Sequence, residues 1–503
     1  MAACALEDNM RLYARGRVEN ELSAASAEGS PLTTAEAFFE RCTMAYCGLP
    51  ALTKASEFFR RERGGAGARS AERAEPASAS AAGVLLDFGS GYAADSRVLA
   101  ARGEAEVWAL EVQAHISAVA ERVTRELGVS EQALKHVCAN LLTDETALPP
   151  NHFDHCLSRL VFLHLPDRAL LFERLANVLK PSGSVFIEDF FVLNPLTSAE
   201  ESSLASVVAC PYLPTQEEYI SHLEAAGFEV LSFEHMNAEW LPFVEHRLRM
   251  FREREERHRR VHGEKLFEEM ITFYSTIESL FRGGNLGGAR ITARKAKMTI
   301  LYCTSNDGKF QEAKAALRAV VPSAAVVRVQ SEVTEVQGSA AEVAAAKAAA
   351  THRELARTHP SLLASAHWLL TEDVALGVGC LGGFPSVYVK SFMHALGSSE
   401  RLWNVVNKFE DQSAVVTCYV GAIKLDGDNP TPRVFEGVLE GAVVAPEAPS
   451  AGGSYSASSD WSPAFKPAGA PLALASLSPE EQARFSHRRI ALEAFAAHAL
   501  AKC

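Results

Sequence analysis

A β-strand that leads into a small-residue turn and then a helix begins two stretches of this sequence, and this pattern constrains the fold most. The first stretch is VLLDFGSGYAADSRVL, from Val84, and the second is MTILYCTSNDGKFQEAKAAL, from Met298. Strands that alternate with helices favour a sheet covered by helices. The two turns differ in chemistry, so they do not form an internal repeat. The 503 residues are therefore predicted to hold two separate α/β units, within the two or three domains that such a length suggests.

Breaks in composition set the expected domain boundaries. Residues 1–60 include helical patterning and are predicted to form an N-terminal helical cap. Residues 61–82 are rich in Ala, Gly, Ser and Arg and have almost no large apolar side chain, so a flexible loop is expected there. Residues 83–295 then form the first α/β unit, and residues 296–503 form the second.

The charge balance and the cysteines exclude several classes of protein. With 49 Lys and Arg against 62 Asp and Glu, the net charge is −13, which disfavours sequence-independent binding of nucleic acid. No apolar run approaches the ~20 residues that cross a bilayer, so no membrane partner is expected. The ten cysteines are scattered without a Cys-x-x-Cys pair, as suits a reducing compartment. We expect a cytoplasmic protein.

The turn after the first strand has the composition of a nucleoside-binding site. Gly89 and Gly91 allow the backbone to approach a ligand at the carboxyl end of the strand. The next strand, EVWALE, ends in Glu111, whose carboxylate can accept hydrogen bonds from both hydroxyls of a ribose. A Gly-x-Gly turn alone also fits an ordinary tight turn, but the acid downstream favours the nucleoside.

Two further segments extend this pattern. HFDHCLSRLVFLHL (152–165) is a strand followed by a helix start, and VLKPSGSVFIEDFF (178–191) is a helix end, a turn and a buried strand. With the acid-x-Gly-x-Gly loop, they resemble class I S-adenosylmethionine-dependent methyltransferases, and most closely the sarcosine/dimethylglycine and phosphoethanolamine N-methyltransferases. The resemblance implies a Rossmann-like fold and S-adenosyl-L-methionine as cofactor, bound through Asp87, Gly89, Gly91, Glu111 and Asn140.

The methyl acceptor is implied only as a small molecule. In the phosphoethanolamine enzymes an Asp and a His serve the reacting amine; here Leu160 stands at the Asp position, whereas His164 keeps the His. His164 is either a catalytic base or a buried histidine with satisfied hydrogen bonds. The segment from Glu245 to Met270 is predicted to be a helix whose Arg side chains pair with Glu on a solvated face. An anionic substrate or nucleic acid is the alternative partner for this segment.

The second unit contains lysines and carboxylates on separate elements. Lys309 begins a helix directly after a strand, where backbone N–H groups favour a phosphate. Such cations bind phosphates, and carboxylates are hard ligands for Mg²⁺, so the set suits a magnesium-bound polyphosphate. Its members are Lys309, Lys347, Lys390, Glu335, Glu372 and Asp373.

Five ordered motifs make this unit similar to the inosine triphosphate pyrophosphatase family: T-x-N-x-x-K, E-D followed by L-G-G-x-P-x-x-Y-x-K, F-E-D-x-S-A, P-x-F-x-P-x-G and S-H-R. The resemblance implies an α/β domain with an elongated mixed sheet, hydrolysis of ITP, dITP or XTP to monophosphate and pyrophosphate, and a homodimer formed through this unit. It implies phosphate binding by Asn306, Lys309, Lys347 and Lys390, base recognition by Trp461, Ser486, His487 and Arg488, magnesium binding by Glu335, Glu372 and Asp373, and catalysis by Glu335 and Asp373.

The sequence also departs from the family pattern. The family's F-G-W-D is here Ser459-Asp460-Trp461-Ser462, and Gln482 replaces a lysine. Our main hypothesis is a bifunctional methyltransferase and nucleotide pyrophosphatase. In the alternative, an active methyltransferase carries a degenerate domain used for nucleotide binding or dimerisation. In a third, the methyltransferase half only binds its cofactor as a regulator.

Overall fold

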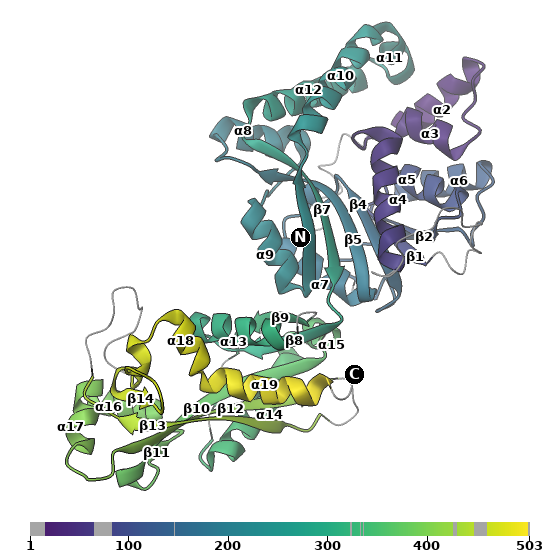
Figure 1. Cartoon of the computed structure of the whole chain (residues 1–503). Coiled ribbons are helices and arrows are strands. Elements are labelled where there is room, and N and C mark those ends of the chain that lie inside the picture. Colours follow the sequence, from purple (N-terminus) through teal and green to yellow (C-terminus); the bar gives the residue numbers. More distant parts are fainter. Residues whose placement is uncertain are drawn as a thin grey trace. The chain divides into compact units, whose positions relative to one another are not determined.

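The computed structural model describes residues 16–64, 83–144, 146–321, 324–331, 333–334, 336–425, 430–446 and 460–500. These residues divide into two compact units between Ala296 and Lys297 (Figure 1). The predicted loop at 61–82 lies outside the described residues from position 65 onward, while residues 61–64 continue helix α4 (Gly48–Gly64). None of the described helices is both long and apolar enough to cross a bilayer.

The first unit is built on a seven-stranded sheet with the order β3-β2-β1-β4-β5-β7-β6. Strands β1 to β5 pair in parallel, whereas β7 runs antiparallel to both of its neighbours. The order reverses between β1 and β4, and ligands bind at such a switch point in open α/β sheets. The predicted Rossmann-like fold is confirmed. The strands are β1 (Val84–Phe88), β2 (Glu106–Glu111), β3 (Leu134–Cys138), β4 (Phe153–Arg159), β5 (Leu179–Val192), β6 (Phe228–His235) and β7 (Leu286–Lys295).

Helices cover both faces of this sheet and gather at one end of it. The helices that alternate with the strands are α5 (Ala94–Ala101), α6 (Ala114–Glu126), α7 (Arg168–Val178) and α9 (Gln216–Ala225). In the first unit, Figure 1 shows α2 (Arg17–Ala27) and α3 (Ala35–Cys42) facing α10, α11 and α12 across one end. Residues from the chain's start therefore lie beside residues from its middle.

One local prediction for this unit was wrong. The single charged helix expected from Glu245 to Met270 is three helices, α10 (Asn237–Glu253), α11 (Glu255–His262) and α12 (Glu264–Gly283). Gly263, at a φ of 79° and a ψ of 164°, ends the second of them in a conformation that other residues rarely adopt. The expected Pro-Gly turn near 181–183 is present as an irregularity within β5: Ser182 has a φ of 64°, and the pairing with β4 jumps from Leu179 to Ser184.

The second unit contains a mixed sheet with the order β14-β13-β12-β10-β8-β9, and β11 pairs with the edge of β10. Strands β8, β9 and β10 are parallel, and β12, β13 and β14 continue the sheet antiparallel. The predicted elongated mixed sheet is confirmed. The strands are β8 (Met298–Cys303), β9 (Ala324–Val329), β10 (Trp368–Val378), β11 (Pro385–Ser386), β12 (Ser413–Lys424), β13 (Arg433–Val443) and β14 (Phe465–Pro467).

Two glycines let helices approach this sheet closely. A Cβ on Gly437 of β13 would lie 2.0 Å from the carbonyl oxygen of His487, at the start of α19 (His487–Leu500). A Cβ on Gly421 of β12 would lie 2.6 Å from the carbonyl oxygen of Ala344 in α14 (Ala340–Thr358). Helix α13 (Asp307–Val320) shares a buried apolar cluster with α19. Backbone contact thus fixes the helices that carry the candidate site.

Candidate functional site

The glycine turn of the first unit is shaped by its neighbours. Gly89 has a φ of 72° and Gly91 a φ of 53°, which glycine adopts without strain. The backbone N–H groups of Gly89 and Ser90 both donate to the carbonyl of Leu110 at 2.9 Å. A Cβ on Gly89 would lie 2.3 Å from the side chain of Val161. The turn is therefore held against the second strand and against the loop after β4.

Glu111 lies beside this turn because β1 and β2 pair in register up to Phe88 and Leu110. Its carboxylate accepts backbone N–H bonds from Gly91 and from Gln113, each at 2.9 Å. Burial raises the pKa of Glu111, whereas these hydrogen bonds act in the opposite direction. The carboxylate is fixed at the carboxyl end of β2, where a ribose is expected.

The other two predicted cofactor residues flank the same edge. Asp87 is buried and accepts a hydrogen bond from the hydroxyl of Ser96, and burial together with the nearby Asp95 raises its pKa to about 7. Asn140 follows β3, which ends opposite Glu111, and its side-chain oxygen accepts the N–H of Leu142 at 3.0 Å. The predicted residues therefore occupy the carboxyl ends of three adjacent strands.

His164 lies in the 3-10 turn η3 (Phe162–His164) and is buried. Its Nδ1 atom is 3.0 Å from the carbonyl oxygen of Ala209. Burial lowers the pKa of His164 to about 4, although this hydrogen bond raises it. The ring is therefore neutral near pH 7 and anchored to the backbone. Leu160, at the position of the family's Asp, adopts a positive φ of 58°.

A buried ion network beside the turn was missed by the sequence reasoning. Arg159, at the end of β4, donates to Glu188 and to Asp95 at 2.8 Å each, and to the carbonyl of Tyr46 at 2.7 Å. Arg290 of β7 also binds Glu188, at 2.8 Å. In the sequence, only the Ser-Arg pair within HFDHCLSRLVFLHL could have indicated this ion network. The network ties the segment between α3 and α4 to the first turn of α5.

In the second unit, Glu372 is the centre of a buried cluster. Its oxygens accept from Lys309 and from Arg488, each at 3.0 Å, and from the hydroxyl of Tyr302. Although burial raises the pKa of Glu372, the charges of Arg488 and Lys309 outweigh this effect and hold it well below its usual range. Two predicted ligand-binding cations are therefore positioned by one predicted metal ligand.

Asp373 faces the other side of β10, because successive side chains of a strand point to opposite faces. Its carboxylate lies 3.7 Å from the ammonium of Lys347 on α14. The pairing of Cys303 with Thr371 places the end of β8 next to these two acids. The structure thus separates Glu372 from Asp373, which the sequence had grouped as metal ligands. Glu335 lies outside the described residues.

Two further predicted phosphate ligands are at helix starts. The side-chain oxygen of Asn306 accepts the N–H of Lys309 at 3.0 Å and so caps α13. Lys390 is exposed in the first turn of α16 (Val389–Leu396). This helix follows β11, which pairs with Leu376 and Gly377. Lys390 therefore lies near the carboxyl end of β10, whereas the cluster around Glu372 lies at the middle of this strand.

The residues predicted to face the base meet at the start of α19. His487 and Trp461 have ring centroids 6.1 Å apart, and burial lowers the pKa of His487 to about 3. Ser486 donates to Glu312, which Arg488 also binds. Ser462, at the position of the family's Asp, donates its hydroxyl to Asp460 at 2.8 Å.

Comparison with known families finds a match in each of the two units. Residues 300–498 match the model of the Ham1 family, and residues 86–187 match the model of a methyltransferase domain. The chain joins a methyltransferase domain to a Ham1-family domain. Both resemblances expected from the sequence are confirmed.

The curated relatives match the Ham1-family domain. Inosine triphosphate pyrophosphatase of Aspergillus fumigatus is 37% identical over 124 residues, which are 25% of this chain and 60% of the relative. The enzyme of the same name from Encephalitozoon intestinalis is 29% identical over 134 residues, 27% of this chain and 64% of the relative. This chain thus spans about three fifths of the length of the curated relatives it matches.

Solved structures show more distant likeness. Phosphoethanolamine N-methyltransferase 2 of Haemonchus contortus in complex with S-adenosyl-L-methionine is 18% identical, with a TM-score of 0.44, and the match covers 58% of this chain and 60% of that one. A cyclopropane synthase of Mycobacterium tuberculosis is 18% identical, with a TM-score of 0.43, and the match covers 58% of this chain and 98% of that one. These likenesses leave the methyl acceptor undefined.

Proposed function

We propose that the Ham1-family domain hydrolyses non-canonical purine nucleoside triphosphates such as ITP, dITP and XTP to monophosphate and pyrophosphate. The observation that carries this proposal is a set of paired charges next to the carboxyl end of β8 and the middle of β10: Lys309 and Arg488 meet Glu372 on one face of the sheet, and Lys347 meets Asp373 on the other. Cations bind the phosphate chain there, with N–H groups at the start of α13. The neutral ring of His487 stands beside Arg488 for contact with the base.

Some of the carboxylates at the site are suitable ligands for a magnesium ion. Asp373 offers a carboxylate with a side chain 17% exposed, and Mg²⁺ is bound in proteins through one or two carboxylates plus substrate phosphates. We propose Asp373 and Glu335 as its ligands and as the residues that serve the attacking water. A bound magnesium ion supplies charge neutralisation for the leaving pyrophosphate. We assign Glu372 to positioning, because its oxygens already accept bonds from three side chains.

Release of pyrophosphate from ITP tests the proposal. Asp373→Asn should lower kcat/KM by about 10²-fold or more, the scale for losing a group that moves a proton in the reaction. Glu400→Gln, an exposed change on α17 (Ser399–Val406), is the matched control and should leave kcat/KM unchanged. If the unsubstituted chain binds ITP without releasing pyrophosphate, the hydrolase proposal fails.

That last outcome would support a degenerate nucleotide-binding domain. The pairing of Ser462 with Asp460 favours this second candidate, because a hydroxyl stands where the family carries an acid. Losing a charge-assisted hydrogen bond to a base costs about 1.5–3 kcal/mol. Ser462→Asp should therefore raise activity toward ITP if the hydrolase has been weakened at this position, and change nothing if hydrolysis has been lost for other reasons.

We also propose that the first unit transfers a methyl group from S-adenosyl-L-methionine to a small molecule. The positive-φ turn at Gly89 and Gly91 beside the fixed carboxylate of Glu111 fits the cofactor. The bound sulfonium supplies an electrophilic methyl group, and the protein has to hold the acceptor in line with it. Incubation with labelled cofactor and a metabolite extract tests the transfer. Cofactor binding without any labelled product would instead favour a regulatory role.

The assembly and the compartment are further parts of this proposal. We propose a homodimer formed through the Ham1-family domain, which sedimentation analysis tests against a monomer of 54.3 kDa.

We propose a cytoplasmic location, and the described cysteines, which all carry free thiols, fit a reducing compartment. A magnesium-dependent activity is tested by chelation, which should abolish release of pyrophosphate.

A further inference from the structure

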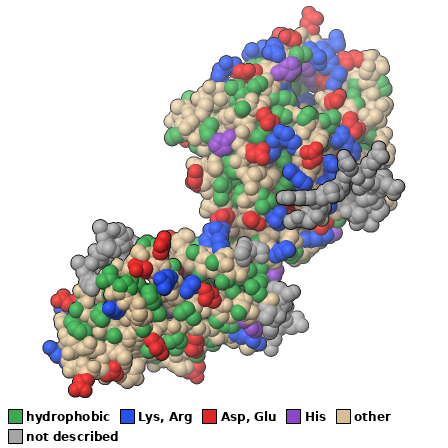
Figure 2. Space-filling view, viewed as in Figure 1, with side chains coloured by type: hydrophobic (Ala, Val, Ile, Leu, Met, Phe, Trp, Pro, Cys, Tyr) green, Lys and Arg blue, Asp and Glu red, His purple; other side chains and the backbone are tan. Residues whose placement is uncertain are grey.

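A cavity of about 380 Å³ opens in the first unit between the N-terminal helices and α10–α12. Its wall includes the basic side chains of Arg17, Arg247, His258 and His262. Figure 2 shows Lys and Arg side chains, with a histidine, gathered over the end of the unit that carries α11. Neither the cofactor turn nor the predicted acceptor residues line this cavity. It is therefore a separate feature that the proposed function does not use.

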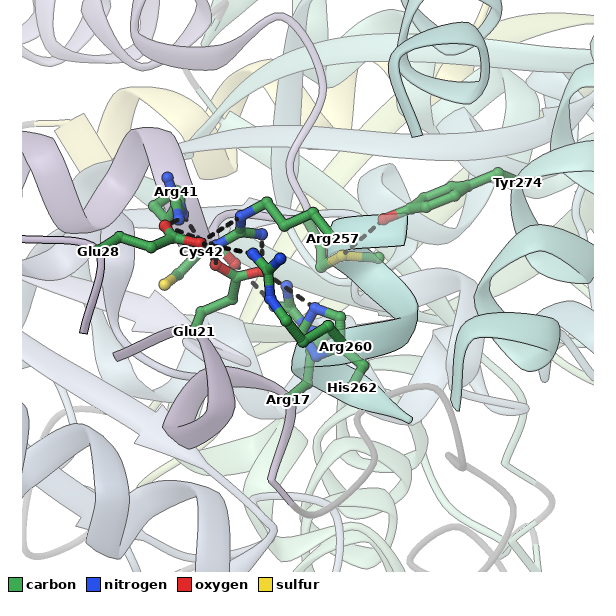
Figure 3. A network of polar contacts seen from close by, with 10 residues as sticks. Arg17, Glu21, Glu28, Arg41, Cys42, Arg257, Arg260, His262 and Tyr274 are labelled. Carbon is green, nitrogen blue, oxygen red and sulfur yellow. Dashed lines mark hydrogen bonds and ion pairs between the residues drawn. The ribbon is translucent and has the colours of Figure 1, made fainter. Parts of the chain in front are cut away.

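The one buried acid of the cavity is already neutralised. Glu21 accepts hydrogen bonds from Arg41 at 2.8 Å and from Arg257 at 2.9 Å, and it lies 3.0 Å from Nε2 of His262. Figure 3 shows this carboxylate in the middle of the cations that surround it. Glu28 adds a second carboxylate on the side of Arg257 and Arg260. The Glu21 carboxylate thus pairs with these cations and forms no ion pair with Arg17 or Arg247.

Two guanidinium groups in the wall, Arg17 buried and Arg247 half-buried, have no ion-pair partner among the residues that the structure describes. Arg17 is 6% exposed; it donates to the carbonyl of Cys42 at 2.7 Å, and its Nε atom is buried without a partner. Arg247 donates to the carbonyls of Met44 and Ala45. A guanidinium has five N–H donors, so both groups keep donors beyond these bonds. A buried charge without a counter-charge is costly.

The wall also has an apolar part, beside the polar side chains of Glu40, Arg41, Thr43 and Tyr274. Leu49, Phe243, Phe251 and Met270 line it, and the ring of Phe251 stacks on His258 with centroids 4.1 Å apart. Sites for small molecules combine apolar side chains with convergent polar groups, and this cavity has both kinds of lining. Its size and lining suit an apolar body that carries one anionic group.

We propose that this cavity binds a small organic anion, with a carboxylate or phosphate on an apolar body held by Arg17 and Arg247. Guanidinium groups bind both anions with charge-assisted hydrogen bonds. A metal ion held by Glu21, His258 and His262, whose ligand atoms lie within 4.8 Å of one another, is the competing occupant. The cations around Glu21 oppose a further positive charge there, so the anion is favoured.

Titration of the full chain with phenyl phosphate, benzoate and neutral benzyl alcohol tests the proposal, with hydrogen exchange used to locate the binding. We expect the two anions, but not the alcohol, to slow exchange in α2, in residues 43–47 and in α11. Arg247→Gln and Arg17→Gln should each weaken this binding at least tenfold. Arg260→Gln is the control, because its side chain on α11 is 70% exposed and does not line the cavity, and it should bind as the unsubstituted chain does.

Protection by phenyl phosphate alone would identify a phosphate site, and protection by both anions a general anion site. If neither anion protects these segments of the unsubstituted chain, the proposal is overturned, whether or not the Arg variants fold. It is equally overturned if Zn²⁺ protects α11 in place of the anions, or if the anions bind the Arg17 and Arg247 variants undiminished.

Discussion

Glu372→Gln should lower the free energy of unfolding of the second unit by about 3 kcal/mol. The Glu372 side chain is 2% exposed and meets Lys309 and Arg488 at 3.0 Å each. Gln keeps the shape but removes the charge, which leaves two cations facing a neutral amide. Removing one partner of a buried ion pair costs about 3–5 kcal/mol. The lower end applies because the Lys309 side chain is 36% exposed.

Differential scanning calorimetry of the full chain measures this effect. For a unit of this size, 1 kcal/mol shifts Tm by about 2–4 °C, so the transition of the second unit should fall by about 6–12 °C. Glu493→Gln is the matched control on α19: its pair with Arg489 is 3.4 Å long and its side chain 42% exposed, so it should change stability by less than about 1 kcal/mol.

The pH dependence supplies a second check with a defined sign. The pKa of Glu372 is held low in the folded chain, so its stabilisation is present above the ordinary glutamate pKa of ~4.3 and is lost as the pH falls below that value. The difference in Tm between the unsubstituted chain and Glu372→Gln should therefore shrink in acid. Equal Tm values for Glu372→Gln and Glu493→Gln, or a difference that grows in acid, would refute the reasoning.

Three further predictions follow from the same contacts. Glu111→Gln should weaken binding of S-adenosyl-L-methionine about tenfold by calorimetry, because a charged acceptor becomes neutral, while the exposed Glu121→Gln should not. The pKa of His487 is lowered to about 3 in the folded chain. As the pH drops from ~6.5, the unfolded chain therefore binds a proton at this residue before the folded chain does, and the free energy of unfolding falls. His487→Gln should reduce this loss of stability in acid unfolding curves. Gly437→Ala should destabilise the second unit by about 1–3 kcal/mol, because the added Cβ meets the carbonyl of His487, and an unchanged Tm would contradict this packing.

The strands and the turns that carry motifs could be predicted from the sequence, because apolar runs and glycines are local signals. The turn at Gly89 and the end of β2 at Glu111 lie together for that reason. The breaks in the charged segment could not be placed, because high charge hides the periodicity that separates α10 from α11 and α12. Gly263 was the one residue that could have indicated a break.

The geometry of the charged residues was beyond sequence reasoning. Glu372 and Asp373 look like one pair of acids in the sequence, yet strand alternation places them on opposite faces of β10. The partners of Glu372 come from α13 and α19, which are far apart in the chain. The ion network of Arg159 likewise joins residues from five separate elements and loops. Such pairings depend on tertiary contacts that no local pattern contains.

The close approach at Gly437 has a consequence for redesign of nucleotide preference. The backbone of β13 and the backbone at the start of α19 are in direct contact there, so only a residue without a Cβ fits at position 437. Under the proposed function, exchanges of the His487 side chain would change which purine is accepted while this backbone contact is kept. A library that tests this proposed role of His487 should therefore leave Gly437 untouched.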